Sequence, residues 1–185
     1  MENLYTITIY TENFVGLLNR ITIIFTRRHI NIESITASES EIKNIHRYTI
    51  VVKTTEELVK KVVAQIEKVV DVLRAAYFTD EEIVYQEIAL YKVRTESFMK
   101  GDNVEKIIRM FNARILTIEP EYIVIEKCGH KTETQQLFEE LLPFGVLQFV
   151  RSGRVALTKE IKEMTAYLKE LEQQRSYSVI SNINN

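Results

Sequence analysis

Apolar and polar residues alternate over residues 4–10, which is typical of a β-strand with one buried face. Apolar residues then recur at helical spacing from Leu17 to Phe25. Further strands are expected over 31–37, 46–52 and 72–78. A second helix is expected to start at the Thr-Thr-Glu-Glu segment 54–57. The order strand, helix, strand, strand, helix, strand predicts a ferredoxin-like βαββαβ module.

The same order returns further along the chain. Strands are expected over 87–93, 115–118, 122–125 and 146–150, and helices over 104–111 and around 137–141. The predicted fold class is therefore α+β, with two ferredoxin-like modules in tandem and a C-terminal helix. The expected domains are a first module over 1–78, an acidic linker over 79–86, a second module over 87–157, and a helix and tail over 158–185.

In the expected tail helix, apolar residues form a seam that one helix cannot bury alone. These residues are Ile161, Met164, Leu168 and Leu171. Docking on the chain's own domain and docking on a partner are both open.

The first strand leads through a polar turn into a helix that has Gly16 at its start. The first amides of a helix lack intrahelical partners and carry the positive end of its dipole, so they can receive an anion. Glycine has no side chain to hold that anion away, and Asn13 can cap the helix or reach a ligand. The alternative is that Asn13 caps, Gly16 only turns the chain, and no ligand binds. The second copy lacks this turn, because residues 94–103 are longer, so the copies are not expected to be equivalent in function.

The composition is that of a globular protein with a true core. Of 185 residues 45% are hydrophobic, and the formal net charge is −2, so no broad basic field favours nucleic acid or an anionic membrane. There is no apolar run long enough to span a membrane and no signal-peptide pattern. The single cysteine fits a reducing compartment, and a cytoplasmic location is expected.

The chain shows no residue pattern of an enzyme. No nucleophile triad order, phosphate-binding loop or zinc-protease motif occurs among its residues, so no catalytic residues are expected. Cys128 and His130 would supply two metal ligands, but zinc needs three or four, and an exposed turn is the simpler interpretation. Strand 46–51 has one aromatic residue and no glycine, which argues against RNA recognition of the kind that ferredoxin-like domains perform.

Four segments carry a resemblance to a known family. The turn over 12–18 and the Asn-Ile-Glu-Ser segment within 31–36 resemble an ACT domain. Together with segments 69–74 and 151–157, they resemble more narrowly the small regulatory subunits of acetolactate (acetohydroxyacid) synthase. The resemblance covers roughly residues 4–160.

This resemblance implies a noncatalytic regulatory subunit with no cofactor of its own. Its partner would be the acetolactate synthase catalytic subunit, on which thiamine diphosphate, Mg and FAD are expected. In that family the small subunit activates its partner and confers feedback inhibition by valine, sometimes by leucine or isoleucine. The alternative is a stand-alone ACT-domain amino-acid sensor or adaptor that acts on a different partner.

The resemblance also implies a homodimer through the ACT domains, with the effector between the turn of one copy and residues of the other. Amides around residues 15–17 would receive its carboxylate, two asparagines its polar end, and apolar residues its side chain. The implied effector-binding residues are Asn13, Phe14, Val15, Gly16, Leu17, Leu18, Asn31 and Ile32. The chain departs from the family at Phe14 and Val15, where small polar residues or proline are usual.

Overall fold

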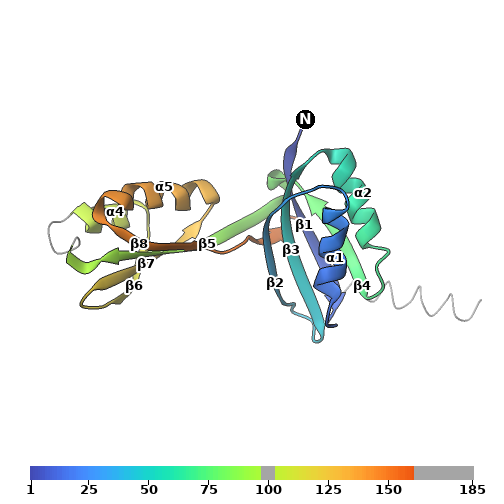
Figure 1. Ribbon diagram of the computed structural model, residues 1–185, viewed down its shortest axis with the longest axis horizontal. Coiled ribbons are helices and arrows are strands. Elements are labelled where there is room, and N and C mark those ends of the chain that lie inside the picture. Colours follow the sequence, from blue (N-terminus) through green and yellow to red (C-terminus); the bar gives the residue numbers. More distant parts are fainter. Residues whose placement is uncertain (97–102, 161–185) are drawn as a thin grey trace, which may run out of the picture.

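A computed structural model describes residues 1–96 and 103–160 of the chain. Figure 1 shows two layered modules joined by one long strand, β5. Most of the helix and tail expected over 158–185, including its apolar seam, lies outside the described residues. In the described part of the chain, no helix is long and apolar enough to cross a membrane.

The first module has the predicted order of elements. It consists of β1 (Asn3–Glu12), α1 (Leu17–Thr26), β2 (Ile32–Glu39), β3 (Ile45–Thr54), α2 (Glu56–Ile66) and β4 (Val72–Phe78). The strands form an antiparallel sheet in the order β2-β3-β1-β4, with both helices on one face (Figure 1). This is the ferredoxin-like arrangement that the sequence predicts.

Local signals set the ends of the helices. Thr55 caps α2, because its Oγ1 accepts a hydrogen bond from the Leu58 amide at 3.4 Å. Helix α1 ends at Thr26, because His29 adopts a left-handed conformation with φ 53°. The Ile30 amide then donates to the Phe25 carbonyl, which closes a Schellman-type helix end.

Strand β1 is buried on both faces, whereas the alternation predicted one buried face. Tyr5, Ile7 and Ile9 point into the core beneath the helices. On the opposite face Thr6 and Thr8 are also buried, at 0% and 5% exposure. The prediction fails there because part of the second module covers that face.

The second module repeats the fold. It contains β5 (Ile83–Arg94), α4 (Asn103–Met110), β6 (Arg114–Ile118), β7 (Tyr122–Gly129), α5 (Lys131–Leu141), η2 (Leu142–Phe144) and β8 (Val146–Arg151), with sheet order β6-β7-β5-β8. Tyr91 ties β5 to α5, because its hydroxyl donates to the Thr134 carbonyl at 2.7 Å. Burial raises the pKa of Tyr91 to about 12.

The segment between the modules is more ordered than the acidic linker expected over 79–86. Thr79 and Glu82 form a capping box around the short helix η1 (Asp80–Glu82), which lowers the pKa of the Glu82 carboxyl through hydrogen bonds from Thr79. Residues 83–86 already belong to β5 and pair with β9 (Val155–Thr158), a strand that the periodicity does not predict. Strand β5 therefore belongs to two sheets.

The two faces of α1 offer a direct test of the core. Ile21 is fully buried and Ile23, two residues on, is 39% exposed. We expect Ile21→Ala to lower the free energy of unfolding by about 2–5 kcal/mol, because it leaves a cavity under the sheet. The matched change Ile23→Ala is expected to cost less than about 1 kcal/mol. Denaturant unfolding followed by circular dichroism measures both, and equal losses would contradict this packing.

Candidate functional site

The turn after β1 opens α1 with a glycine. Gly16 occupies the N-cap position with φ 84°, a left-handed conformation that glycine adopts without strain. Asn13 does not cap the helix, since no side chain does so; the Asn13 amide instead donates to the Asn44 carbonyl at 3.1 Å. The structure therefore corrects the alternative in which Asn13 is the cap.

The amides that follow Gly16 are left for solvent or a ligand. The first intrahelical bond runs from the Arg20 amide to the Gly16 carbonyl, and the Leu17 amide makes only a 3.4 Å contact with the Phe14 carbonyl. Among the described residues, the amides of Leu18 and Asn19 have no backbone partner. A carbon atom added to Gly16 would meet nothing within 4 Å, so the approach to these amides is open.

Helix α1 begins without an acidic residue, unlike α2, α4 and α5. Its first turn contains no aspartate or glutamate, whereas Glu56 and Glu57 lie in the first turn of α2, Glu105 in that of α4 and Glu133 in that of α5. Carboxylates stabilise the positive end of a helix dipole. The first turn of α1 thus holds no acid of its own, and the Asp71 carboxylate that reaches this turn is bound to Arg20 Nη2 at 2.8 Å. The open amides suit an external carboxylate.

The side chains of the turn divide between core and solvent. Leu17 is fully buried in the core of the first module, so its side chain is not free to contact a ligand as the resemblance implied. Phe14, Val15 and Leu18 are exposed, at 54%, 104% and 39%. The Phe14 side chain therefore does not fill the space beside Gly16.

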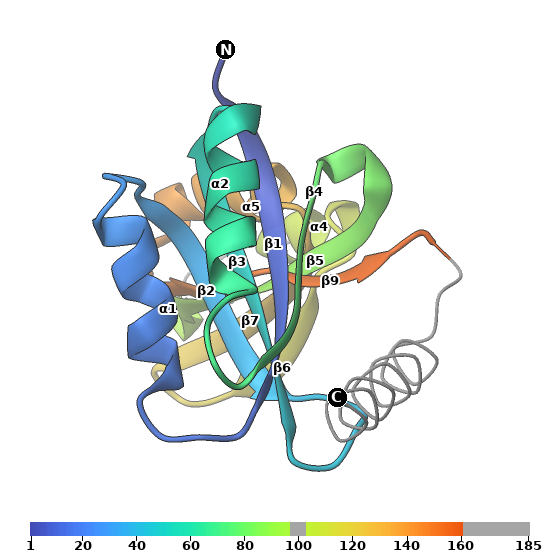
Figure 2. The same cartoon turned by 90° about the vertical axis from the view of Figure 1, so that its right-hand side faces the viewer.

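The remaining two residues of the expected site lie elsewhere in the same chain. Asn31 and Ile32 follow the far end of α1, which is ten residues, or about 15 Å, long (Figure 2). Asn31 is exposed, and its side-chain Nδ2 donates to Glu33 Oε1 at 3.3 Å. Ile32 is partly buried against the core. A single chain does not bring these two residues to the turn.

Two of the segments that carry the resemblance, 31–36 and 151–157, come together between the modules. Strand β2 has a bulge between Ile32 and Ser34, after which Thr36 pairs with Thr49. Gly153 lies against this strand so closely that a Cβ would be 2.5 Å from Thr36 Oγ1 and 3.1 Å from the Ile35 carbonyl oxygen. Only glycine permits this approach of the two backbones.

A buried arginine holds the modules together. Arg154 is 3% exposed, and its Nη1 donates to Asp80 Oδ1 at 2.6 Å and to Thr6 Oγ1 at 2.9 Å. Its guanidinium also stacks on the ring of Tyr85, 3.8 Å from the centroid. From the first module, Arg47 donates to the Ala156 carbonyl of β9. The sequence patterns assigned no role to Asp80 or Arg154, because charged residues in a turn and on a short strand give no periodic signal.

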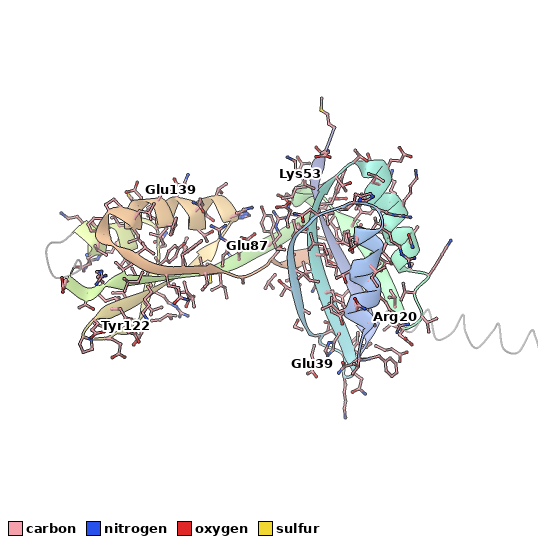
Figure 3. The ribbon with its side chains drawn as sticks, in the orientation of Figure 1. Arg20, Glu39, Lys53, Glu87, Tyr122 and Glu139 are labelled. Carbon is pink, nitrogen blue, oxygen red and sulfur yellow. The ribbon has the colours of Figure 1, made fainter. Side chains whose placement is uncertain are left out.

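Burial shapes the electrostatics of this junction. It raises the pKa of the Tyr85 hydroxyl, and the Asp80 carboxylate that accepts its hydrogen bond acts in the same direction, while the positive charge of Arg154 opposes both. Figure 3 labels Glu87 on β5 where the strand passes between the modules. Within residues 1–96 and 103–160, no three histidine, cysteine, aspartate or glutamate side chains gather as metal ligands do.

The fold defines an ACT-type class of protein: an ACT-type domain followed by a second ferredoxin-like module. The family model for the small subunit of acetolactate synthase matches residues 86–160, and that for the small-subunit-like ACT domain matches residues 7–74. The chain belongs to the acetolactate synthase small-subunit family.

Individual relatives agree with this assignment. The small subunit of Bacillus subtilis acetolactate synthase is 32% identical over 172 residues, covering 92% of this chain and 98% of that one. That of Mycobacterium bovis is 30% identical over 155 residues, covering 84% and 92%. The crystal structure of the Thermotoga maritima small subunit superimposes with a TM-score of 0.78 at 25% identity, over 86% of this chain and 99% of that one.

The Arg154–Asp80 pair predicts a specific loss of stability. Asp80→Asn removes the carboxylate from a buried guanidinium, and we expect the free energy of unfolding to fall by about 1–3 kcal/mol. The matched variant Glu81→Gln changes an exposed neighbouring acid and is expected to stay within about 0.5 kcal/mol of the native chain. Denaturant unfolding, with hydrogen exchange of the β9 amides, measures both. Unchanged protection of β9 in Asp80→Asn would contradict the role of this pair.

Proposed function

We propose that this chain is the regulatory subunit of an acetolactate synthase, which activates the catalytic subunit and confers feedback inhibition by valine or a related branched-chain amino acid. The observation that carries the proposal is the unpartnered amides at the start of α1, a helix with no acidic residue in its first turn. Family membership supports the choice of partner, because the similar proteins are named as small subunits of that synthase.

In this proposal the effector carboxylate meets the amides that follow Gly16, and Asn13 contacts its polar groups. Asn31 and Ile32 come from a second copy, because in one chain they lie beyond the other end of α1. Strand β2 stands at the edge of its sheet and has only β3 as a partner among the described strands. An unpaired edge beside the effector site supports side-by-side pairing of two ACT domains in a homodimer.

Energetics argue that polar anchoring provides much of the affinity. Burying a branched aliphatic side chain contributes about 1.5–3 kcal/mol, while a millimolar dissociation constant already requires about 4 kcal/mol. Phe14 and Val15 are exposed in the single chain and are available to cover the effector. Bulky residues in place of the usual small ones would then select among valine, leucine and isoleucine by size.

Inhibition follows if the effector binds more tightly to one arrangement of the ACT dimer and the catalytic subunit prefers another. The chemistry belongs to the partner, which in this proposal carries thiamine diphosphate, Mg and FAD. A stand-alone sensor with another partner is the alternative. The match of the second module to the synthase small subunit favours the first proposal, since a sensor needs only the ACT domain.

Reconstitution tests the proposal directly. We expect this chain to raise the turnover of the acetolactate synthase catalytic subunit from the same cell, and valine, leucine or isoleucine to reduce the turnover of the mixture. The catalytic subunit alone, with and without each amino acid, is the control. Turnover that does not change when the chain is added would contradict the proposed function.

A pair of variants at Gly16 tests the effector site. Aspartate and asparagine both tolerate the left-handed conformation of position 16, but only aspartate adds a negative charge beside the amides. We expect Gly16→Asp to raise the half-inhibitory effector concentration about tenfold or more through repulsion of the effector carboxylate, and to leave activation intact. Gly16→Asn is expected to retain most of the inhibition. Equal inhibition of the native chain and Gly16→Asp would place the effector elsewhere.

A further inference from the structure

A cavity of about 410 Å³ lies between the two modules, away from the turn at Gly16. Strands β1, β2 and β3 line it from the first module, and β5, α5 and the segment between β8 and β9 line it from the second. Its volume falls in the range of small-molecule sites. Neither module forms this cavity alone.

The polar wall of the cavity contains charged groups whose hydrogen bonds are incomplete. Glu87 is 6% exposed, and its nearest cationic atoms are Arg151 Nε and Arg154 Nε, each 3.8 Å from a carboxylate oxygen. Both Nε atoms are buried and have no hydrogen-bond partner in the described chain. Buried polar groups are normally satisfied, so these two N–H donors indicate a missing hydrogen-bond acceptor.

The charges around the cavity have both signs. Arg154 is already held by Asp80 and Thr6, while Arg151 donates from Nη2 to Gln135 Oε1 at 3.1 Å and lies 3.8 Å from Glu87. Arg151 and Lys131 are the other cations that line the cavity, and Glu87 and Glu33 are its anions. A ligand with only a negative charge would meet two carboxylates, and one with only a positive charge would meet two cations. A zwitterion satisfies both pairs.

An apolar wall completes the cavity. Leu4 of β1, Ile35 of β2 and Val51 of β3 line it, and Ile35 is 38% exposed in the single chain. A short aliphatic side chain would remove this surface from water. Opposite charges beside an apolar wall match the chemistry of an aliphatic α-amino acid.

We propose that the cavity between the modules binds a small aliphatic α-amino acid, as a second site distinct from the turn at Gly16. Its carboxylate pairs with Arg151 and Lys131, its ammonium group pairs with Glu87 and Glu33, and its side chain packs on Leu4, Ile35 and Val51. Because both modules supply the walls, the ligand stabilises their docked arrangement, by an amount set by its concentration relative to its dissociation constant. The site is complete within one chain and needs no second copy.

The experiment uses the full chain with Gly16→Asp, so that binding at the turn is weakened about tenfold or more. Isothermal titration calorimetry with L-valine, L-leucine and L-isoleucine is expected to find one site per chain. The matching 2-oxo acids lack the ammonium group and the matching amines lack the carboxylate, so both are expected to bind about tenfold more weakly or worse.

A matched pair of lysine variants locates the site. Lys131 lines the cavity and is exposed, so Lys131→Gln is expected to fold normally and to weaken binding about tenfold. Lys106→Gln, on α4 of the same module and away from the cavity, is the control and is expected to bind as before. Circular dichroism confirms that both variants are folded.

Three results would overturn the second site. These are the absence of amino-acid binding in the Gly16→Asp chain, equal binding of the 2-oxo acids, and equal affinity of the Lys131→Gln and Lys106→Gln variants. The first result, together with binding to the native chain, leaves the proposed regulatory function in place. Loss of activation in the reconstituted enzyme would instead contradict that function without bearing on the cavity.

Discussion

The arrangement of the two modules depends on the contacts of the buried Arg154 guanidinium. It connects Thr6 of β1, Asp80 of the turn after β4 and the ring of Tyr85 on β5. A charge this deeply buried is stable only while its partners stay in place. The modules are therefore linked by this ion pair and hydrogen bond as well as by the polypeptide chain. As a result, the face of β1 that carries Thr6 and Thr8 is buried.

Strand β1 connects two very different environments. Its end leads to the turn at Gly16, where backbone amides stand open, and its beginning supplies Leu4 to the cavity between the modules. Eight residues of the strand, 5–12, lie between Leu4 and the turn, a span of about 27 Å. One environment needs a second copy to be completed, and the other needs the second module of the same chain. Effects at the two places are thus separable by mutation.

Much of the fold could be predicted because each module buries its core through local amphipathic patterns. The apolar stripe of α1, the cap Thr55 and the position of β1 along the chain all lie where the sequence pattern indicates. Strand β9 escaped prediction because its pattern is reversed. Val155 and Leu157 face solvent at 60% and 63% exposure, while the small Ala156 faces inward at 3%.

By itself, the sequence determined the two modules, their order of elements, and an open, glycine-started helix suited to a carboxylate. These features depend on neighbours within a few residues, which periodicity and capping rules describe. Only the tertiary structure decided that Asn31 and Ile32 lie away from that turn, and that Gly153 and Arg154 meet the first module. The contacts of Gly153 with Thr36 and of Arg154 with Thr6 join residues 117 (153 − 36) and 148 positions apart, and no local pattern encodes which distant surfaces will pack together.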